Sequence, residues 1–211
     1  MHTPQLALPL TWHPLFEDHL FFVGNSNRLA FDWIQSWPWP HCCSCVFGPK
    51  SSGKTHLGML WAKKHSAQWI DHPPVVQNHQ HYIWDHFVCA SEDLLISFFE
   101  DLKRSSATCL FLAYHPPSKW SLDREDVRSR FLTMPCVDVR LPDDDVLYHV
   151  LKKCFHDHGM RVSSGLISFL IQRMPRSFDA AQSLTKILHT RFLEEKHIPS
   201  KNMIQKILDS L

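Results

Sequence analysis

The residues with the clearest chemistry form the stretch GPKSSGKT at positions 48–55. It fits the pattern G-x-x-x-x-G-K-[ST] of a phosphate-binding loop (P-loop) at every fixed position. Gly48 and Gly53 let the backbone bend so that successive N–H groups point at phosphate oxygens. Lys54 adds a cation for the β- and γ-phosphates, and the hydroxyl of Thr55 is a ligand for Mg²⁺. The stretch therefore predicts a site for a nucleoside phosphate.

The segments on either side of this loop are those that a P-loop requires. Residues 42–47 form a short apolar run that predicts a buried strand, and residues 55–64 predict a helix. The positive end of that helix would face the phosphates. A glycine-rich turn that matches the pattern by chance is the alternative, and the flanking strand and helix make it the weaker interpretation.

A Mg²⁺ ion in such a site needs an acid at the end of a neighbouring strand. Asp85, within the apolar run 82–87, is the candidate, although an acid that only caps a loop would look the same. Many P-loop ATPases place a second acid directly after it to activate water, and here that position is His86. Because imidazole cannot act as a carboxylate base, we expect at most weak ATP turnover by this chain.

Three arginines have two interpretations each. Arg128 and Arg130 either form a solvated face or reach the γ-phosphate held by a neighbouring subunit, where a guanidinium stabilises transferred charge. Arg176 either folds back over the phosphates or lies in water. Spacing alone leaves these alternatives open.

Composition limits the class of protein. The chain has 211 residues, of which 44% are hydrophobic and 20% charged, which suits one domain of ordinary size, or a domain with a small appendage, and a real core. A formal net charge of +1 argues against a broad basic surface for duplex DNA. We find no signal peptide and no membrane span, so the seven cysteines are expected to be reduced thiols in a cytoplasmic protein. A zinc site at His41, Cys42, Cys43 and Cys45 is the weaker alternative.

The order of expected elements predicts an α/β fold with a parallel sheet, followed by helices. Strands are expected at 42–47, 69–70, 82–87, 109–114 and 137–141, and helices at 29–37, 55–64, 93–103, 143–158, 163–174, 177–196 and 200–211. Strands stop near Pro142, so we divide the chain into an extended tail (1–14), an α/β core (15–142) and a helical subdomain (143–211).

The N-terminal tail contains an amphipathic extended hexapeptide at residues 5–10. Its residues are Gln5, Leu6, Ala7, Leu8, Pro9 and Leu10. Leucines beside a single glutamine suit docking into an apolar groove, with the amide fixing the register. A tail that packs on its own core is the alternative.

Taken together, these motifs resemble the DnaA/Hda family of AAA+ proteins over nearly the whole chain, and the shorter Hda members more closely. The segment 22–30 is similar to the family's adenine-side segment, 82–87 to its second nucleotide motif, and 129–131 to its arginine-finger motif. Residues 174–178 are similar to its sensor-arginine motif, and residues 5–10 to the peptide that binds the DNA polymerase sliding clamp.

The resemblance implies an AAA+ P-loop core with a C-terminal α-helical lid, and it implies a set of site residues. The nucleotide, ADP or ATP, would contact Phe22, Val23, Gly48, Pro49, Lys50, Ser51, Ser52, Gly53, Lys54, Thr55, His56 and Arg176. Mg²⁺ would be held by Thr55 and Asp85, and Arg130 would be the finger that acts in trans. Gln5, Leu6, Leu8, Pro9 and Leu10 would bind the clamp.

The function that the resemblance implies is negative regulation of replication initiation. An ADP-bound, clamp-tethered protein would contact DnaA and stimulate its ATP hydrolysis; a homo-oligomer is compatible with the pattern, and no membrane is involved. A DnaA-like or helicase-loader-like ATPase is the alternative.

Several positions depart from the family pattern. Only 29 residues separate Thr55 from Asp85, so the second strand–helix unit should be reduced, and the chain ends with the helical subdomain. Both features argue against direct DNA binding. Tyr114 stands where a polar sensor is expected, which, with His86, argues against ATP turnover.

Overall fold

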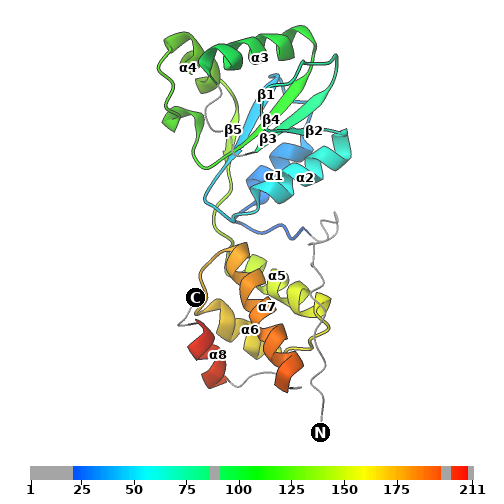
Figure 1. Cartoon of the computed structure of the whole chain (residues 1–211), viewed down its shortest axis with the longest axis vertical. Helices are drawn as coiled ribbons and strands as arrows, with labels where there is room; N and C mark the ends of the chain where they lie inside the picture. The colour runs from blue at the N-terminus through cyan, green and yellow to red at the C-terminus, as the bar shows by residue number, and fades with distance from the viewer. Residues whose placement is uncertain (1–20, 86–90, 196–200, 209–211) are drawn as a thin grey trace.

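A five-stranded parallel sheet forms one half of the molecule, and a bundle of helices forms the other (Figure 1). The computed structural model describes residues 21–85, 91–195 and 201–208. The strands are β1 (Cys43–Phe47), β2 (Gln68–Ile70), β3 (His81–Asp85), β4 (Thr108–Ala113) and β5 (Cys136–Asp138). Their order across the sheet is β2-β3-β4-β1-β5. An α/β fold with a parallel sheet followed by helices is thus confirmed.

The register of the central strands brings their carboxyl ends together. Phe47 at the end of β1 pairs with Ala113 at the end of β4, and Asp85 at the end of β3 pairs with Leu112. The P-loop directly follows β1. Because functional groups in open parallel sheets gather at the carboxyl ends of the strands, this edge is where a site is expected.

Both faces of the sheet are covered by helices. On β4, Cys109 and Phe111 pack against α3 (Glu92–Arg104) and α4 (Glu125–Leu132), whereas Leu110 and Leu112 pack against α1 (Arg28–Gln35) and α2 (Lys54–His65). All six residues of β4 are buried, which explains why its sequence is a continuous apolar run. The described cysteines of the sheet are free thiols.

The connection between β2 and β3 contains no helix over residues 71–80. The expected reduction of the unit between Thr55 and Asp85 is therefore confirmed. A helix that the sequence analysis did not predict is α4, which buries only Val127 and Phe131. Two apolar residues in eight give too weak a periodic signal to identify a helix from sequence alone.

The helical half contains α5 (Asp144–Asp157), α6 (Ser164–Ile171), α7 (Phe178–Glu195) and α8 (Lys201–Leu208) around a core of their own. Side-chain caps begin three of these helices: Asp143 accepts from the N–H of Val146 at 2.9 Å, Ser163 from the N–H of Leu166 at 3.3 Å, and Ser177 from the N–H of Ala180 at 3.1 Å. Among the described residues, no helix has the length and apolar character needed to cross a membrane.

Asp143 also joins the two halves of the molecule. Its second carboxylate oxygen accepts a hydrogen bond from the N–H of Ser26 at 3.0 Å. Ser26 belongs to the segment that enters α1, so this bond ties the N-terminal part of the α/β half to the start of α5. The bundle is thereby held beneath the carboxyl edge of the sheet (Figure 1).

Candidate nucleotide-binding site

The P-loop is a tight backbone turn between β1 and α2 that requires glycine at two positions. A Cβ on Gly48 would lie 2.1 Å from the carbonyl oxygen of Val139, which no side chain tolerates. Gly53 has a φ of 98° and forms the N-cap of α2. Since only glycine adopts such a conformation at little cost, the two glycines of the motif are explained by the backbone itself.

Lys54 lies inside the curve of this loop. Its ammonium donates hydrogen bonds to the carbonyl oxygens of Gly48 at 2.9 Å and Pro49 at 2.7 Å. Burial lowers the pKa of Lys54, and the nearby carboxylate of Asp85 opposes that shift. The ammonium also lies 5.0 Å from the centre of the Tyr114 ring, at the end of β4. The carbonyl groups of the loop therefore fix the Lys54 ammonium at the position where phosphate would bind.

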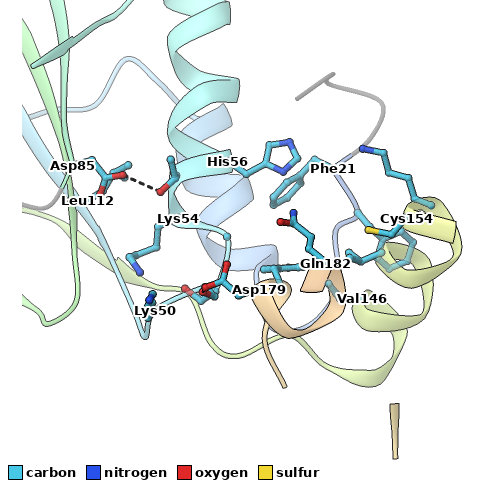
Figure 2. A pocket seen from close by; sticks show the side chains of 18 of the residues that line it. Phe21, Lys50, Lys54, His56, Asp85, Leu112, Val146, Cys154, Asp179 and Gln182 are labelled. Carbon is cyan, nitrogen blue, oxygen red and sulfur yellow. Dashed lines mark hydrogen bonds between the residues drawn. The ribbon is translucent and has the colours of Figure 1, made fainter. Parts of the chain in front are cut away.

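Thr55 and Asp85 meet beside this lysine. The hydroxyl of Thr55 donates to a carboxylate oxygen of Asp85 at 2.9 Å, as Figure 2 shows. The two residues come from the first turn of α2 and the end of β3, so the register of the sheet places them together. A hydroxyl and a carboxylate are oxygen donors of the kind that Mg²⁺ prefers.

The polar groups of the loop fit a phosphate. The hydroxyl of Ser52 is buried and has no hydrogen-bond partner among the described residues. Buried hydroxyls normally have partners, so this atom is a candidate donor to a phosphate oxygen. The start of α2 adds backbone N–H groups and a partial positive charge. Together with the Lys54 cation, these groups form a cradle suited to an anion. A bound anion would also give the Ser52 hydroxyl the hydrogen-bond partner that the described residues do not supply.

A cavity of about 360 Å³ opens between this loop and the helical bundle (Figure 2). Of the residues predicted to contact nucleotide, those that line it are Phe22, Lys50, Ser51, Ser52, Gly53, Lys54, Thr55 and His56, and the predicted metal ligand Asp85 also lines it. Val23, Gly48, Pro49 and Arg176 do not line it. Gly48 and Pro49 instead act through their carbonyl groups, which hold Lys54.

Two aromatic residues that line the cavity, Phe21 and Phe22, pack against both halves of the molecule. Phe22 stacks on His149 of α5, with ring centres 3.8 Å apart and an interplanar angle of 15°. Phe21 and His56 of α2 form a T-shaped pair with ring centres 5.0 Å apart. A flat apolar surface beside a phosphate cradle is suited to a nucleoside base.

The wall contributed by the bundle was missed by the sequence analysis. It consists of Val146, Val150, Lys153, Cys154 and Asp157 from α5, together with Phe178, Asp179 and Gln182 from α7. The α5 residues recur at helical spacing on one face, but this pattern is equally typical of a packed core. Burial raises the pKa of the Cys154 thiol to about 11, so this sulfur is an apolar part of the wall.

The two predicted arginines lie elsewhere. Arg176 pairs with Asp144 at 2.7 Å, and its side chain is 51% exposed. Arg130, on the last turn of α4, pairs with Glu100 of α3, and its side chain is 34% exposed. It lines a second pocket of about 250 Å³ with Cys42, at the opposite end of β1 from the P-loop. The structure therefore places Arg130 away from the cavity of its own chain.

Three predictions concern residues outside the described part of the structure. They are the clamp-binding role of Gln5, Leu6, Leu8, Pro9 and Leu10, the position of His86, and the tail at 1–14. They stay predictions.

The sheet order, the P-loop and the helical bundle together define a parallel α/β P-loop domain followed by a helical subdomain, a fold shared with solved structures of DnaA and RuvB. No family model and no curated protein matches the sequence. The fold is similar to domain III of the replication initiation protein DnaA from Thermotoga maritima, with a TM-score of 0.75 and 13% identity over 94% of this chain and 97% of that one.

Two further structures show the same likeness. AMPPCP-bound DnaA from Aquifex aeolicus has a TM-score of 0.63 and 16% identity over 86% of this chain and 68% of that one. A variant of RuvB from Thermotoga maritima has a TM-score of 0.66 and 17% identity over 88% and 67%. At these identities the likeness shows a shared fold.

Proposed function

We propose that this chain is an adenine-nucleotide-binding regulator of DNA replication initiation. The observation that carries the proposal is the P-loop cradle, in which Lys54, Ser52 and the Thr55–Asp85 pair converge on one cavity. Thr55 and Asp85 would hold Mg²⁺, which would neutralise phosphate charge. The similar fold of AMPPCP-bound DnaA supports an adenine nucleotide as the ligand.

The regulatory role is that of a protein acting on a partner. In this proposal the chain holds ADP, is tethered to the sliding clamp through residues 5–10, and stimulates ATP hydrolysis by DnaA. Arg130 supports it, since this arginine lies on a partly exposed surface remote from the chain's own phosphate cradle. An arginine in that position is suited to act on a nucleotide held by another subunit.

A DnaA-like or helicase-loader-like ATPase that assembles on DNA is the second candidate. The fold is similar to those of both DnaA and RuvB, and this similarity is the observation that supports the second candidate. The helix-free connection between β2 and β3 and the formal net charge of +1 favour the regulator, because neither adds a DNA-binding surface.

The first test is calorimetric titration of the protein with ADP in the presence of Mg²⁺. Lys54→Ala should weaken ADP binding roughly 10- to 100-fold, because a charge-assisted hydrogen bond contributes about 1.5–3 kcal/mol. Lys63→Ala, an exposed lysine at the other end of α2, is the matched control and should bind as the wild type does. Equal affinity in the wild type and the Lys54 variant would contradict nucleotide binding by this loop.

The second test separates the two candidate functions. Purified protein and sliding clamp are added to ATP-bound DnaA, and phosphate release is followed. The regulator should raise DnaA hydrolysis while hydrolysing little ATP alone. ATP turnover by the chain itself, with no effect on DnaA, would favour the ATPase instead.

A further inference from the structure

Asp179 is an acid that the first turn of α7 presents to the P-loop (Figure 2). Its carboxylate accepts a hydrogen bond from the hydroxyl of Ser51. The N–H of Phe178 also donates to the carbonyl oxygen of Ser51 at 3.2 Å. The Phe178 ring lies 3.0 Å from the point that a Cβ on Gly53 would occupy. The start of α7 and the loop are thus joined through backbone, ring and carboxylate.

The charges around this contact have a definite arrangement. Lys50 and Lys54 of the loop line the cavity as cations, and Asp85 lies at the Mg²⁺ end. Arg176, three residues before Asp179, turns away to pair with Asp144 at 2.7 Å. The first turn of α7 therefore places the Asp179 carboxylate beside the phosphate cradle, whereas the Arg176 guanidinium lies away from it.

This arrangement affects phosphate chains according to their charge. A diphosphate has one phosphate group fewer than a triphosphate and therefore carries less negative charge. The Asp179 carboxylate should repel it less. For an assumed separation of about 8 Å between the third phosphate group and the carboxylate, an added unit charge in surroundings between protein surface and bulk water changes a binding constant roughly 3- to 30-fold. A repulsion of that size is measurable as a change in the ratio of the two binding constants.

We propose that Asp179 is a specificity-determining residue that disfavours nucleoside triphosphates relative to diphosphates in this cavity. The proposal rests on the proposed function, since it requires that the P-loop bind nucleotide. It assigns to α7 a role in selecting the ligand through a charge that no part of the P-loop pattern contains.

The decisive variant is Asp179→Asn, which removes the charge and keeps an oxygen that accepts from Ser51. ADP and AMPPCP are titrated separately by calorimetry with excess Mg²⁺, and the two dissociation constants are compared. The ratio of the AMPPCP constant to the ADP constant should fall roughly 3- to 30-fold, mainly through tighter AMPPCP binding. Glu194→Gln, an exposed acid near the other end of α7 that pairs with Arg191, removes the same charge far from the cavity. It should leave the ratio unchanged.

Asp179→Glu tests whether the charge or the contact decides. It keeps the carboxylate and should keep the wild-type ratio. A ratio in Asp179→Asn equal to that of the wild type, with ADP still bound by both, would overturn the inference and leave nucleotide binding intact. An equal change of ratio in the Asn and Glu variants would also overturn it, since contact geometry would then be the cause. Failure of the wild type to bind either nucleotide would overturn the proposed function itself, and this inference with it.

Discussion

Arg130 offers the sharpest test of action in trans, because the residue of its own chain with which it forms an ion pair is known. The guanidinium pairs with Glu100, and the two side chains are 34% and 43% exposed. Exposed ion pairs of this kind contribute about 0.2–1 kcal/mol. To reach another subunit's phosphate, Arg130 must leave Glu100 at that cost. Glu100→Gln removes the cost and should raise stimulation of DnaA hydrolysis by up to about fivefold, since 1.4 kcal/mol corresponds to tenfold.

The assay is phosphate release from ATP-bound DnaA at subsaturating amounts of this protein with clamp present. Asp101→Asn is the matched control, because the neighbouring acid of α3 pairs with Arg104. Arg130→Ala should lose stimulation by roughly 10³–10⁵-fold, the range measured for arginine fingers. It should keep ADP binding, since Arg130 does not line the cavity. Stimulation that survives Arg130→Ala, or that falls in Glu100→Gln, would refute the reasoning.

Three other predictions concern the rest of the chain. Burial lowers the pKa of both His65 and His81, so the unfolded chain takes up protons first as pH falls through 6.5. The free energy of unfolding should be retained above about pH 7 and decline toward pH 5.5. Melting temperatures measured across this range should fall with pH, and they should fall less in the His81→Phe variant, which has one titrating group fewer. ATP turnover by the protein alone should stay below about one per second, the low end of typical enzymes, because His86 stands where an acid is expected; a malachite-green assay that finds faster release would contradict this. Replacing Gln5 and Leu8 with alanine should abolish clamp capture in a pull-down and leave the melting temperature unchanged; a large drop in melting temperature with capture intact would show a structural tail.

The P-loop and its flanking strand and helix were predictable because the chemistry fixes both residue types and spacing. Gly48 has no room for a Cβ, Gly53 needs a positive φ, and Lys54 must reach back to two carbonyls. The strand that became β4 was equally clear, because both of its faces are buried and its apolar run is continuous.

The cavity wall was not predictable, because it depends on contacts between distant parts of the chain. Ser51 and Asp179 are 128 positions apart, and no local pattern distinguishes an acid that meets a phosphate loop from one in an ordinary first helical turn. Val146, Val150 and Cys154 have the spacing of a core face, and tertiary packing turns that face toward a cavity. Their role could be read only after α5 was placed beneath the loop.

The contacts of Arg176 and Asp179 link the proposed sensor arginine to the choice of nucleotide. Asp179 lies in the first turn of α7 and contacts Ser51, whereas Arg176 lies two residues before that helix and pairs with Asp144. The pair with Asp144 is exposed, so breaking it costs about 1 kcal/mol or less. Since Arg176 is only three residues from Asp179 along the chain, bringing Arg176 over the loop would also shift Asp179 and the Phe178 ring that lies against Gly53 of the loop. A triphosphate would therefore have to supply enough attraction for Arg176 to break both contacts, whereas a diphosphate could bind with them in place.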